Sequence, residues 1–309
     1  MPEPDANLHT RRFASEDDYE RMRTMLTEIV PGAPRGLPWF TGDLDWWRAT
    51  ASDSNQIERV QLWDAAGRLM GFVWVSDDET GVVVRPENPS VLHDIYAWIE
   101  ARTEKAADEA TTPVRHDALV YDSDLEWQTV LTERGYRRGA EDSWAFRQPV
   151  HPAMPAPLLP AGYRIDDMGG ASEDDIERRV KLHLAAFPSS SLTVAQYRAA
   201  MASPTYRPAL DLIAVAPGGQ FAAFCNIWFE PVNRLGVFEP VGCDPAYRRR
   251  GFARAVLAEG LRRLSALGAA TASVMSFASN TAANRLYAAA GFEHVDVMRN
   301  WIKATEDGR

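Results

Sequence analysis

The stretch of the chain that most constrains its fold is residues 241–254, which read VGCDPAYRRRGFAR. They overlap the end of an apolar run, residues 235–243, that is typical of a strand. Pro240 lies inside this run and predicts a bulge or a splay, because proline cannot donate a ladder hydrogen bond. After the stretch, apolar residues recur at helical spacing as far as Gly268, which supplies a helix stop. The stretch is therefore a turn that leads from a strand directly into a helix.

The turn itself has the composition of an anion-binding site. Its centre is Arg-x-x-Gly-x-Ala, in which the small residues Gly251 and Ala253 let backbone N–H groups face an anion at the start of the helix. Three consecutive arginines, Arg248, Arg249 and Arg250, stand at the end of the helix where the dipole disfavours cations, which indicates a bound anion. A solvated basic run is the alternative interpretation. Pyrophosphate is the anion that such a turn fits.

A second motif follows a second strand-like run, residues 271–277, and reads NTAANRLYAAAGF from Asn280 to Phe292. The two motifs, in this order and with a helix and a strand between them, resemble the signature of the GCN5-related N-acetyltransferase (GNAT) superfamily. That signature is V-x-P-x-[YF]-[RQ]-x-x-G-x-[GA] followed by N-x-x-A-x-x-L-Y-x-x-x-G-F. Ala253 stands where glycine is commoner in the family. The resemblance covers residues 162–303.

The resemblance implies an α/β fold in which a mixed, mostly antiparallel and splayed sheet is flanked by helices. The expected order is strand, two helices, three strands, helix, strand, helix and two strands. The sequence after residue 162 fits this order, with capping-box patterns at Ser172 and Thr193 for the two helices. The other elements expected before the first motif are a strand at 163–168 and a hairpin of strands at 212–216 and 221–229.

The first part of the chain repeats this order without the motif residues. Its predicted elements are strands at 8–13, 60–63, 69–75, 82–84 and 118–121 and helices at 16–26, 91–102 and 125–134. Where a phosphate-binding turn is expected, residues 85–90 carry two prolines without N–H groups and a glutamate that repels a pyrophosphate. Aligning Gly135 with Gly291 replaces the motif tyrosine by Leu131. The same alignment replaces the motif asparagine by Asp124.

Length and composition support two domains. A chain of 309 residues exceeds the usual size of one domain, and 46% hydrophobic residues allow two cores. Closely spaced prolines in residues 149–161 predict an extended, semi-rigid linker. We therefore expect a degenerate GNAT-like domain at 1–148, a linker at 149–161 and a catalytic domain at 162–309. For the first of these, an unrelated α/β domain is the alternative.

Four aromatic residues cluster near the start of the chain: Trp39, Phe40, Trp46 and Trp47. We expect them to lie in a core. The alternative is that they line a pocket, because pockets are built largely from aromatic side chains.

Charge and composition exclude several classes of function. The formal net charge of −10 argues against a nucleic-acid partner and is compatible with a cationic substrate. The two cysteines give neither a disulfide framework nor metal-ligand spacing, so no metal is expected. No apolar run approaches about 18 residues, and the first residues lack the pattern of a signal peptide. We expect a soluble, cytoplasmic protein, monomeric or homodimeric, without a membrane partner.

The resemblance implies acetyl-CoA as the acyl donor. In the family, backbone groups of the splayed strand hold the acyl thioester and the pantetheine arm, and those of Val241 and Cys243 are expected to lack ladder partners. The residues expected to contact the cofactor are Val241, Cys243, Arg248, Arg249, Arg250, Gly251, Phe252, Ala253, Arg254 and Asn280. For Asn280, a plain helix N-cap is the alternative.

Acyl transfer from a thioester to an amine needs a neutral amine and a protonated leaving thiolate. By the resemblance, Tyr287 is the general acid that protonates the thiolate, and packing against the sheet is its alternative role. Glu239 is the candidate base, because it lies two residues before Val241 and hence on the same face of the strand. A solvent-facing glutamate is the alternative. Cys243 is not expected to be a nucleophile, because no neighbouring histidine activates it.

These inferences predict an acetyl-CoA-dependent N-acetyltransferase that acts on a small-molecule amine by direct attack. Two alternatives stay open. One is a protein that senses acyl-CoA without turnover, since a fold does not fix a function. The other is an acetyltransferase that modifies an amine of a peptide or a protein.

Overall fold

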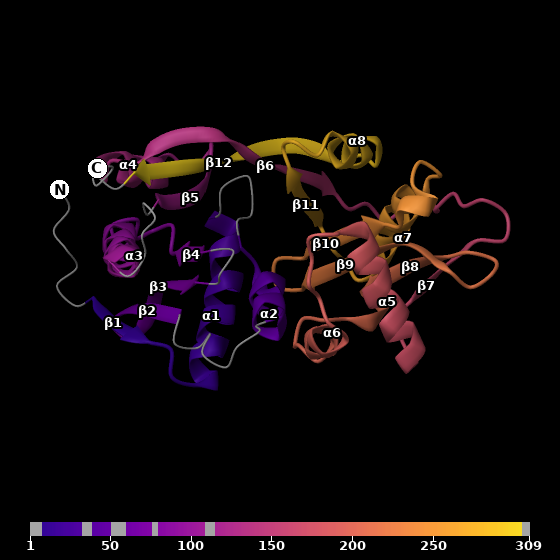
Figure 1. The fold of residues 1–309 in the computed structure, drawn as a ribbon, viewed down its shortest axis with the longest axis horizontal. Coiled ribbons are helices and arrows are strands. Elements are labelled where there is room, and N and C mark those ends of the chain that lie inside the picture. Colours follow the sequence, from indigo (N-terminus) through magenta and orange to yellow (C-terminus); the bar gives the residue numbers. More distant parts are fainter. Residues whose placement is uncertain (1–7, 33–38, 51–59, 76–79, 109–114, 305–309) are drawn as a thin grey trace. The chain divides into compact units, whose positions relative to one another are not determined.

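The computed structural model describes residues 8–32, 39–50, 60–75, 80–108 and 115–304, and the chain forms two compact units (Figure 1). Unit 1 is formed by residues 1–40, 53–144 and 296–309. Unit 2 is formed by residues 41–52 and 145–295. Each unit therefore takes segments from both halves of the sequence.

Unit 1 contains an antiparallel sheet of four strands in sequential order and a second ladder in which β12 lies between β5 and β6. The elements that contribute to it are β1 (His9–Arg12), α1 (Glu16–Ile29), a 3₁₀ helix (Val30–Gly32), β2 (Val60–Ala65), β3 (Arg68–Val75), β4 (Thr80–Val84), α3 (Val91–Asp108), β5 (Arg115–Tyr121), α4 (Leu125–Glu133) and parts of β6 (Arg137–Pro149) and β12 (Glu293–Ala304).

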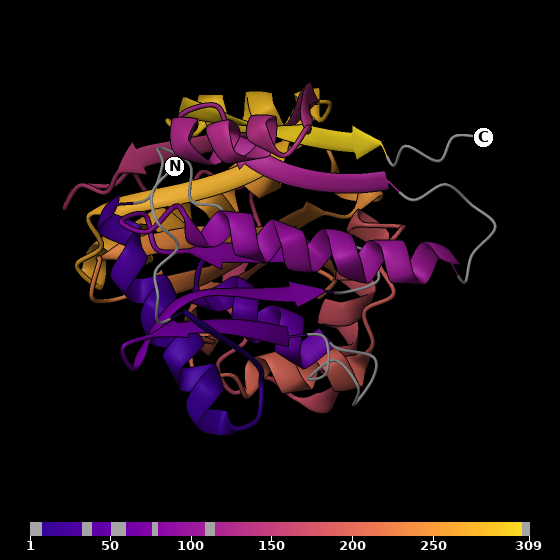
Figure 2. The same cartoon turned by 90° about the vertical axis from the view of Figure 1, so that its left-hand side faces the viewer.

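Helices α1 and α3 lie on opposite sides of the four-stranded sheet, and α3 runs along it (Figures 1 and 2). Gly71 of β3 marks the close approach of α3, because a Cβ atom there would lie 3.1 Å from Ile95. Val73 lies two residues further along β3 and joins the same buried cluster as Ile95 and Tyr96. The sheet and α3 thus enclose a hydrophobic core of unit 1.

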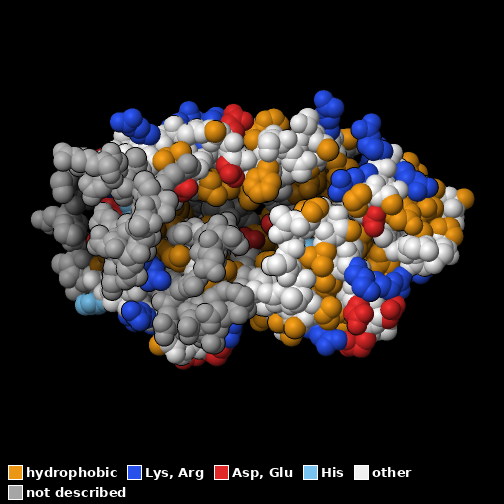
Figure 3. All heavy atoms as spheres, in the orientation of Figure 1, with side chains coloured by type: hydrophobic (Ala, Val, Ile, Leu, Met, Phe, Trp, Pro, Cys, Tyr) orange, Lys and Arg blue, Asp and Glu red, His pale blue; other side chains and the backbone are white. Residues whose placement is uncertain are grey.

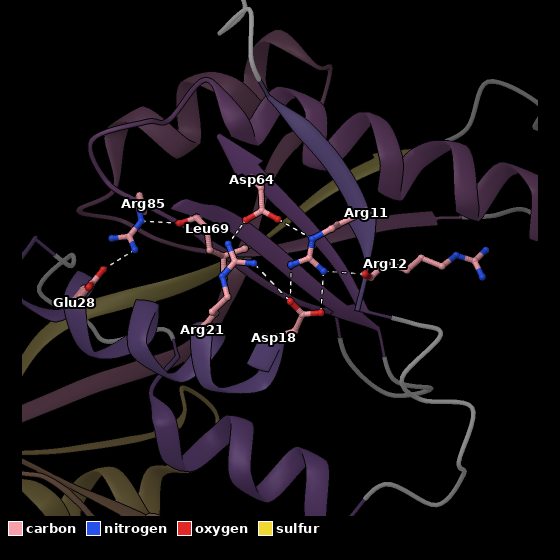
Figure 4. A network of polar contacts seen from close by, with 8 residues as sticks. All are labelled: Arg11, Arg12, Asp18, Arg21, Glu28, Asp64, Leu69 and Arg85. Carbon is pink, nitrogen blue, oxygen red and sulfur yellow. Dashed lines mark hydrogen bonds and ion pairs between the residues drawn. The ribbon is translucent and has the colours of Figure 1, made fainter. Parts of the chain in front are cut away.

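An ion-pair network ties α1 to the first two strands of unit 1 (Figure 4). Arg11 of β1 donates from Nε to Asp64 of β2 at 2.9 Å and from a terminal nitrogen to Asp18 of α1 at 2.8 Å. Arg21 of α1 pairs with both carboxylates. The hydrogen bond from Arg11 lowers the pKa of Asp18, so this carboxylate stays charged. The network fixes the position of α1 on the strands.

Unit 2 contains a sheet with the strand order β6-β11-β10-β9-β8-β7. Its elements, besides the end of β6 and the start of β12, are α2 (Thr41–Thr50), β7 (Arg164–Asp167), α5 (Glu173–Ala186), α6 (Val194–Met201), a 3₁₀ helix (Pro208–Leu210), β8 (Asp211–Val215), β9 (Phe221–Glu230), β10 (Leu235–Cys243), a 3₁₀ helix (Pro245–Tyr247), α7 (Phe252–Ala266), β11 (Thr271–Phe277) and α8 (Thr281–Ala289).

The two faces of this sheet are covered by different helices. Helix α7 covers one face, where a Cβ atom on its Gly260 would lie 2.5 Å from Ile227 of β9. Helix α5 covers the other face, where a Cβ atom on Gly242 of β10 would lie 2.8 Å from Ala186. Both glycines are therefore sites where a helix and a strand approach too closely for a side chain.

Helix α2 was not expected from the sequence, and it packs in unit 2 although it lies within residues 1–148. Asp45 is almost fully buried and accepts a hydrogen bond from the backbone N–H of Thr205 at 3.0 Å. Gln196 of α6 donates from Nε2 to the carbonyl oxygen of Thr50 at 2.6 Å. These contacts join α2 to α6 and the segment after it. The compact units therefore differ from the predicted linear domains at this helix.

The proline-rich segment 149–161 also departs from its expected role as a boundary, because it belongs to unit 2. The backbone N–H of Val150 donates to the carbonyl oxygen of Ala270 at 2.9 Å. The Ser265 hydroxyl donates to the carbonyl oxygen of His151 at 2.9 Å. The chain instead passes between the units inside β6 and inside β12.

The predicted order of elements holds in both units, with two corrections at the ends. Strand β6, of 13 residues, was not predicted. After α8 the described residues contain one long strand, β12, where two strands were expected. From Met298 onward β12 pairs with β5 of unit 1, and the end of β6 lies beside β11 in unit 2. The strand order β5-β12-β6-β11 thus alternates strands from the first and second halves of the sequence.

Helices α4 and α8, which the predicted internal repeat aligns, have the same local structure. Each helix has nine residues and begins after a capping side chain, Asp124 or Asn280, that accepts a hydrogen bond from the backbone three residues later. Each is followed by a glycine with positive φ, 84° at Gly135 and 96° at Gly291. The alignment of these glycines therefore pairs two positions with the same local structure.

Candidate functional site

The centre of the candidate site is a bulge in β10. Phe238 lies opposite Ile227 of β9 and Val241 lies opposite Cys225, so Glu239 and Pro240 together face the single residue Asn226. A bulge of this kind adds one residue to a strand and shifts the faces of the residues that follow. The predicted bulge at Pro240 is confirmed.

The bulge corrects the argument that put Glu239 on the same face as Val241. Opposite residues of an antiparallel pair project to the same face, so Val241 shares the face of Cys225. Glu239 lies opposite Asn226, the next residue of β9, and therefore belongs to the other face. The prediction from alternating side-chain faces was wrong because the bulge adds one residue to β10.

Beyond the bulge, β10 separates from β11. The parallel pairing of these strands covers Leu235 to Val237 within the described residues, whereas the antiparallel pairing with β9 continues to Cys243. Val241 and Cys243 therefore have partners on the β9 side, which corrects the expectation that their backbone groups lack ladder partners. The edge of β10 that faces β11 is the one that opens, and this opening is the predicted splay.

The turn before α7 presents backbone N–H groups. Among the described residues, none accepts a hydrogen bond from a backbone N–H of residues 249–254, and α7 has no capping side chain. Gly251 has φ 85°, and a Cβ atom there would have no neighbour within 4 Å. Arg249 is also left-handed, with φ 65°. A set of unused donors beside open space at a helix start suits an oxyanion.

The arginines of this turn are exposed. Within the part of the chain that the structure describes, Arg248, Arg249, Arg250 and Arg254 form no ion pair with a carboxylate. Arg248 donates to the carbonyl oxygen of Cys243 at 3.4 Å, and Figure 3 shows Lys and Arg side chains gathered over the part of unit 2 that holds α7. The turn therefore adds positive charge to its unused N–H groups.

Two predicted contact residues have structural side chains. The ring of Phe252 is buried, with its centre 4.5 Å from that of Tyr163, so its backbone N–H alone faces the turn. Asn280 is exposed, and its Oδ1 accepts the hydrogen bond from Ala283 that caps α8. No contact within the described residues joins Asn280 to β10 or to the turn before α7. Its capping role is thus present, and its role toward a cofactor stays a prediction.

The equivalent turn in unit 1 is closed. The backbone N–H groups of Val91, Leu92 and His93 donate to carbonyl oxygens three residues earlier, at 3.0–3.2 Å. Arg85 is buried, donates to a carbonyl of β3 at 2.7 Å and pairs with Glu28 at 2.5 Å (Figure 4). The backbone donors that are unused before α7 are here used by the protein itself, so this turn does not present the features of an anion site.

Tyr287 lies in α8 with its side chain almost fully buried. Its ring centre lies 5.8 Å from that of Phe146 and 6.2 Å from that of Phe292, and its hydroxyl has no hydrogen-bond partner among the described residues. Burial, followed by the negative charge of Glu239, raises the pKa of the phenol above its usual value. The phenol is therefore protonated at neutral pH, and Glu239 is close enough to act on it electrostatically.

Three polar residues at the site were missed in the sequence. Trp228 and Asn226 of β9 both donate to the carbonyl oxygen of Glu239, at 2.7 and 3.4 Å. Asn284 of α8 is buried and donates from Nδ2 to the carbonyl oxygen of Ala278 at 3.2 Å, which fixes the end of β11 to α8. The available signal was an asparagine within an apolar strand, and another three residues before Tyr287 on the same helix face.

The two cysteines are poor nucleophiles. Burial raises the pKa of the Cys243 thiol to about 11 and that of Cys225 well above its usual value. Neither thiol has thiolate character at neutral pH. The described residues hold no group of three or more His, Cys, Asp or Glu placed to bind a metal ion, and none of their helices has the length and apolarity needed to span a membrane.

A sheet that splays after a bulge, a turn of unused N–H groups before a helix and a buried tyrosine on the next helix together define the GNAT class of folds. A sequence model described as the acetyltransferase (GNAT) family matches residues 178–292. This part of the chain belongs to that family. The match includes both motifs and the whole of β10.

Relatives and solved structures extend this result. The mycothiol acetyltransferase of Kineococcus radiotolerans is 34% identical over 143 residues, which are 45% of each chain. The ribosomal protein bS18-alanine N-acetyltransferase of Escherichia coli strain K12 is 39% identical over 91 residues, 29% of this chain and 60% of that one. The chain thus spans about half the length of the curated relatives it matches.

One solved structure is similar along nearly the whole chain. A tandem GNAT protein from the clavulanic acid biosynthesis pathway has a TM-score of 0.67 at 15% identity and covers 96% of this chain and 98% of its own. At this identity the likeness concerns the fold alone. The chain therefore has the fold of a tandem GNAT protein, with the family motifs in its second copy.

Proposed function

We propose that this chain is an acetyl-CoA-dependent N-acetyltransferase that transfers an acetyl group to an amine of a small molecule by direct attack. The observation that carries the proposal is the turn before α7. It combines unused backbone N–H groups, open space at Gly251 and arginines without carboxylate partners. These are the features that a pyrophosphate requires, and unit 1 lacks them at its equivalent turn.

Acetyl-CoA would supply an activated acetyl thioester at this site. The residues that fit its pyrophosphate are those of the turn, Arg248 to Arg254, and the open edge of β10 at Val241 and Cys243 suits an extended chain that pairs with backbone groups. Asn280 is proposed as a further contact from the family resemblance. Residues 162–309 would carry the chemistry, with the first copy as a scaffold or as part of the acceptor site.

Tyr287 and Glu239 are proposed as the acid and the base. Tyr287 keeps its proton because burial and the charge of Glu239 raise its pKa, so it can donate to a leaving thiolate. Glu239 is exposed at the bulge, where its carboxylate can accept a proton from an incoming ammonium group.

The names of the relatives suggest two kinds of acceptor. Several are mycothiol acetyltransferases, which supports a small-molecule acceptor. The ribosomal protein bS18-alanine N-acetyltransferase supports a protein amine as the second candidate. We favour the small molecule because matches of this kind extend over up to 62% of the chain, against 29% for the other.

The test is a screen of the full chain for release of free thiol from acetyl-CoA. The amines offered range from aminoglycosides and polyamines to amino-acid conjugates and peptides. We expect thiol release that depends on one class of small amine. Release with peptides alone would favour the protein acceptor. Binding of acetyl-CoA without release for any amine would support a sensor and contradict the proposed function.

A further inference from the structure

Asn226 is a polar residue in the middle of the buried strand β9. It has 3% of its surface exposed and lies opposite both residues of the β10 bulge. A buried amide group needs hydrogen-bond partners, because an unpaired polar atom in the interior costs about 1–3 kcal/mol. The hydrogen-bond partners of its amide group therefore indicate the role of Asn226.

The Nδ2 group of Asn226 stabilises the bulge. It donates to the carbonyl oxygen of Glu239 at 3.4 Å, and the indole N–H of Trp228 donates to the same oxygen at 2.7 Å. These side chains give that carbonyl the donors that the parallel strand β11 supplies to earlier residues of β10. The position of Glu239 is thus set by two side chains of β9.

The other half of the amide is unused. Asn226 Oδ1 is buried and has no hydrogen-bond partner within the described residues. The amide cannot be turned over without placing an oxygen against the Glu239 carbonyl oxygen and losing the observed hydrogen bond. An acceptor atom is therefore left without a donor, directly beside the exposed carboxylic acid residue of the bulge.

The neighbouring polar groups do not supply this donor. Asp211, which lies opposite Asn226 in β8, accepts from Arg179 at 3.0 Å, from Tyr197 at 2.5 Å and from Tyr206 at 3.2 Å. These donors converge on one carboxylate and form a closed, buried network. Asn226 Oδ1 is not part of this network, and no polar group of the described residues donates to it.

We propose that Asn226 Oδ1 is an acceptor-binding group that receives an N–H of the substrate amine while Glu239 takes its proton. This deepens the proposed function and rests on it. An ammonium group has three N–H donors, so one can meet the Glu239 carboxylate and another Asn226 Oδ1. After the proton moves to Glu239, the N–H bound to Oδ1 stays in place and the freed lone pair can turn toward the thioester. The site therefore suits amines that arrive as cations with at least two N–H groups.

The experiment compares three variants with the amine identified in the screen, and methylamine as the probe of the bare ammonium group. Asn226→Ala removes both halves of the amide. Trp228→Phe is the matched control, because it removes the other donor to the same carbonyl and keeps Oδ1. Asn226→Asp removes the Nδ2 donor and keeps an acceptor oxygen. Acetyl-CoA affinity, measured by calorimetry, reports whether each variant retains the folded site.

We expect Asn226→Ala to raise KM for the amine by about 10-fold or more, as for the loss of a hydrogen bond to a charged group, with acetyl-CoA affinity unchanged. Trp228→Phe lowers kcat and leaves KM for the amine unchanged, and Asn226→Asp does not raise that KM. Equal effects of Asn226→Ala and Trp228→Phe on both constants would overturn the proposal, since Asn226 would then only hold the bulge.

Three further outcomes also support or contradict the proposed role of Asn226. If Asn226→Ala does not fold, a raised KM for the amine in Asn226→Asp contradicts the proposal and an unchanged one supports it. If the wild-type chain releases thiol and Asn226→Ala has the wild-type KM for the amine, the role of Asn226 is overturned and the proposed function stands. A wild-type chain that binds acetyl-CoA but acetylates no amine would overturn the proposed function together with it.

Discussion

At the scale of single residues, Tyr287 is a phenol held in an apolar environment. Its ring packs between Phe146 and Phe292, and burial together with the charge of Glu239 raises its pKa. A raised pKa means that the proton is held more tightly, so Tyr287 stays protonated beyond the usual value of about 10. Its state therefore does not change across the pH range of ordinary assays, which is what a general acid requires.

Tyr287→Phe tests this role directly. The substitution keeps the ring and its packing and removes the O–H donor, so acetyl-CoA affinity should hold while turnover falls by about 100-fold or more. Calorimetry measures the affinity, and thiol release measures the turnover. Wild-type turnover in this variant would show that the thiolate leaves without a proton from Tyr287.

Glu239→Gln tests the base. The amide keeps the size of the side chain and cannot take up a proton, so the rate should fall most at low pH, where the acceptor is mainly ammonium and its deprotonation limits the reaction. As pH rises and the amine becomes neutral in solution, the difference from wild type should shrink. The pH dependence of kcat/KM measures this effect. A profile that matches wild type at every pH would assign the base role to water.

At the scale of elements, the turn before α7 depends on one left-handed glycine. Gly251→Gln should abolish acetyl-CoA binding, because a side chain would enter the space proposed for the phosphates. Gly268, at the other end of α7, is a matched control. It also has positive φ, 79° against 85°, and open space around it. Gly268→Gln therefore introduces the same backbone strain without entering the site.

Calorimetry on the two variants separates strain from loss of the site. We expect no measurable affinity in Gly251→Gln and near wild-type affinity in Gly268→Gln. Both variants should be destabilised to a similar extent in thermal unfolding. Equal affinities in the two would remove the assignment of the turn as a phosphate site.

At the scale of the whole molecule, the two units differ at the turns that precede α3 and α7. The turn of unit 1 uses its own N–H groups and Arg85 internally, whereas that of unit 2 leaves them unused. We therefore predict that one molecule of acetyl-CoA binds per chain. Titration calorimetry gives this number directly. Two sites of similar affinity would contradict the degenerate character of unit 1.

The exchange of elements between the copies leads to a second prediction at this scale. Residues 162–309 expressed alone lack α2 and the end of β6, so Thr205 and Gln196 lose Asp45 and Thr50, and β11 loses a neighbouring strand. We expect this segment to show no cooperative thermal transition by circular dichroism under conditions where the full chain does. A segment that unfolds cooperatively and binds acetyl-CoA would show that it folds independently.

The local pattern of the sequence determined much of the fold. Capping at Ser172 and Thr193, the hairpin strands and the bulge at Pro240 were predicted because each depends on residues close together in the chain. The family and its candidate site followed from two motifs. The turn before α7 could be located to the residue, since its glycine and arginines are contiguous.

Other features depend on contacts between residues distant in sequence, and the tertiary structure alone decided them. Helix α2 has a weak pattern of its own and is placed by Asp45 and Thr205, 160 residues apart. The face of Glu239 follows from how the bulge is divided between Glu239 and Pro240 opposite Asn226, which pairing with β9 sets. Short-range propensity specifies a helix or a strand, whereas packing across the fold decides which element it lies beside. The motifs could therefore be found in the sequence, and the pairing of β6 and β12 could not.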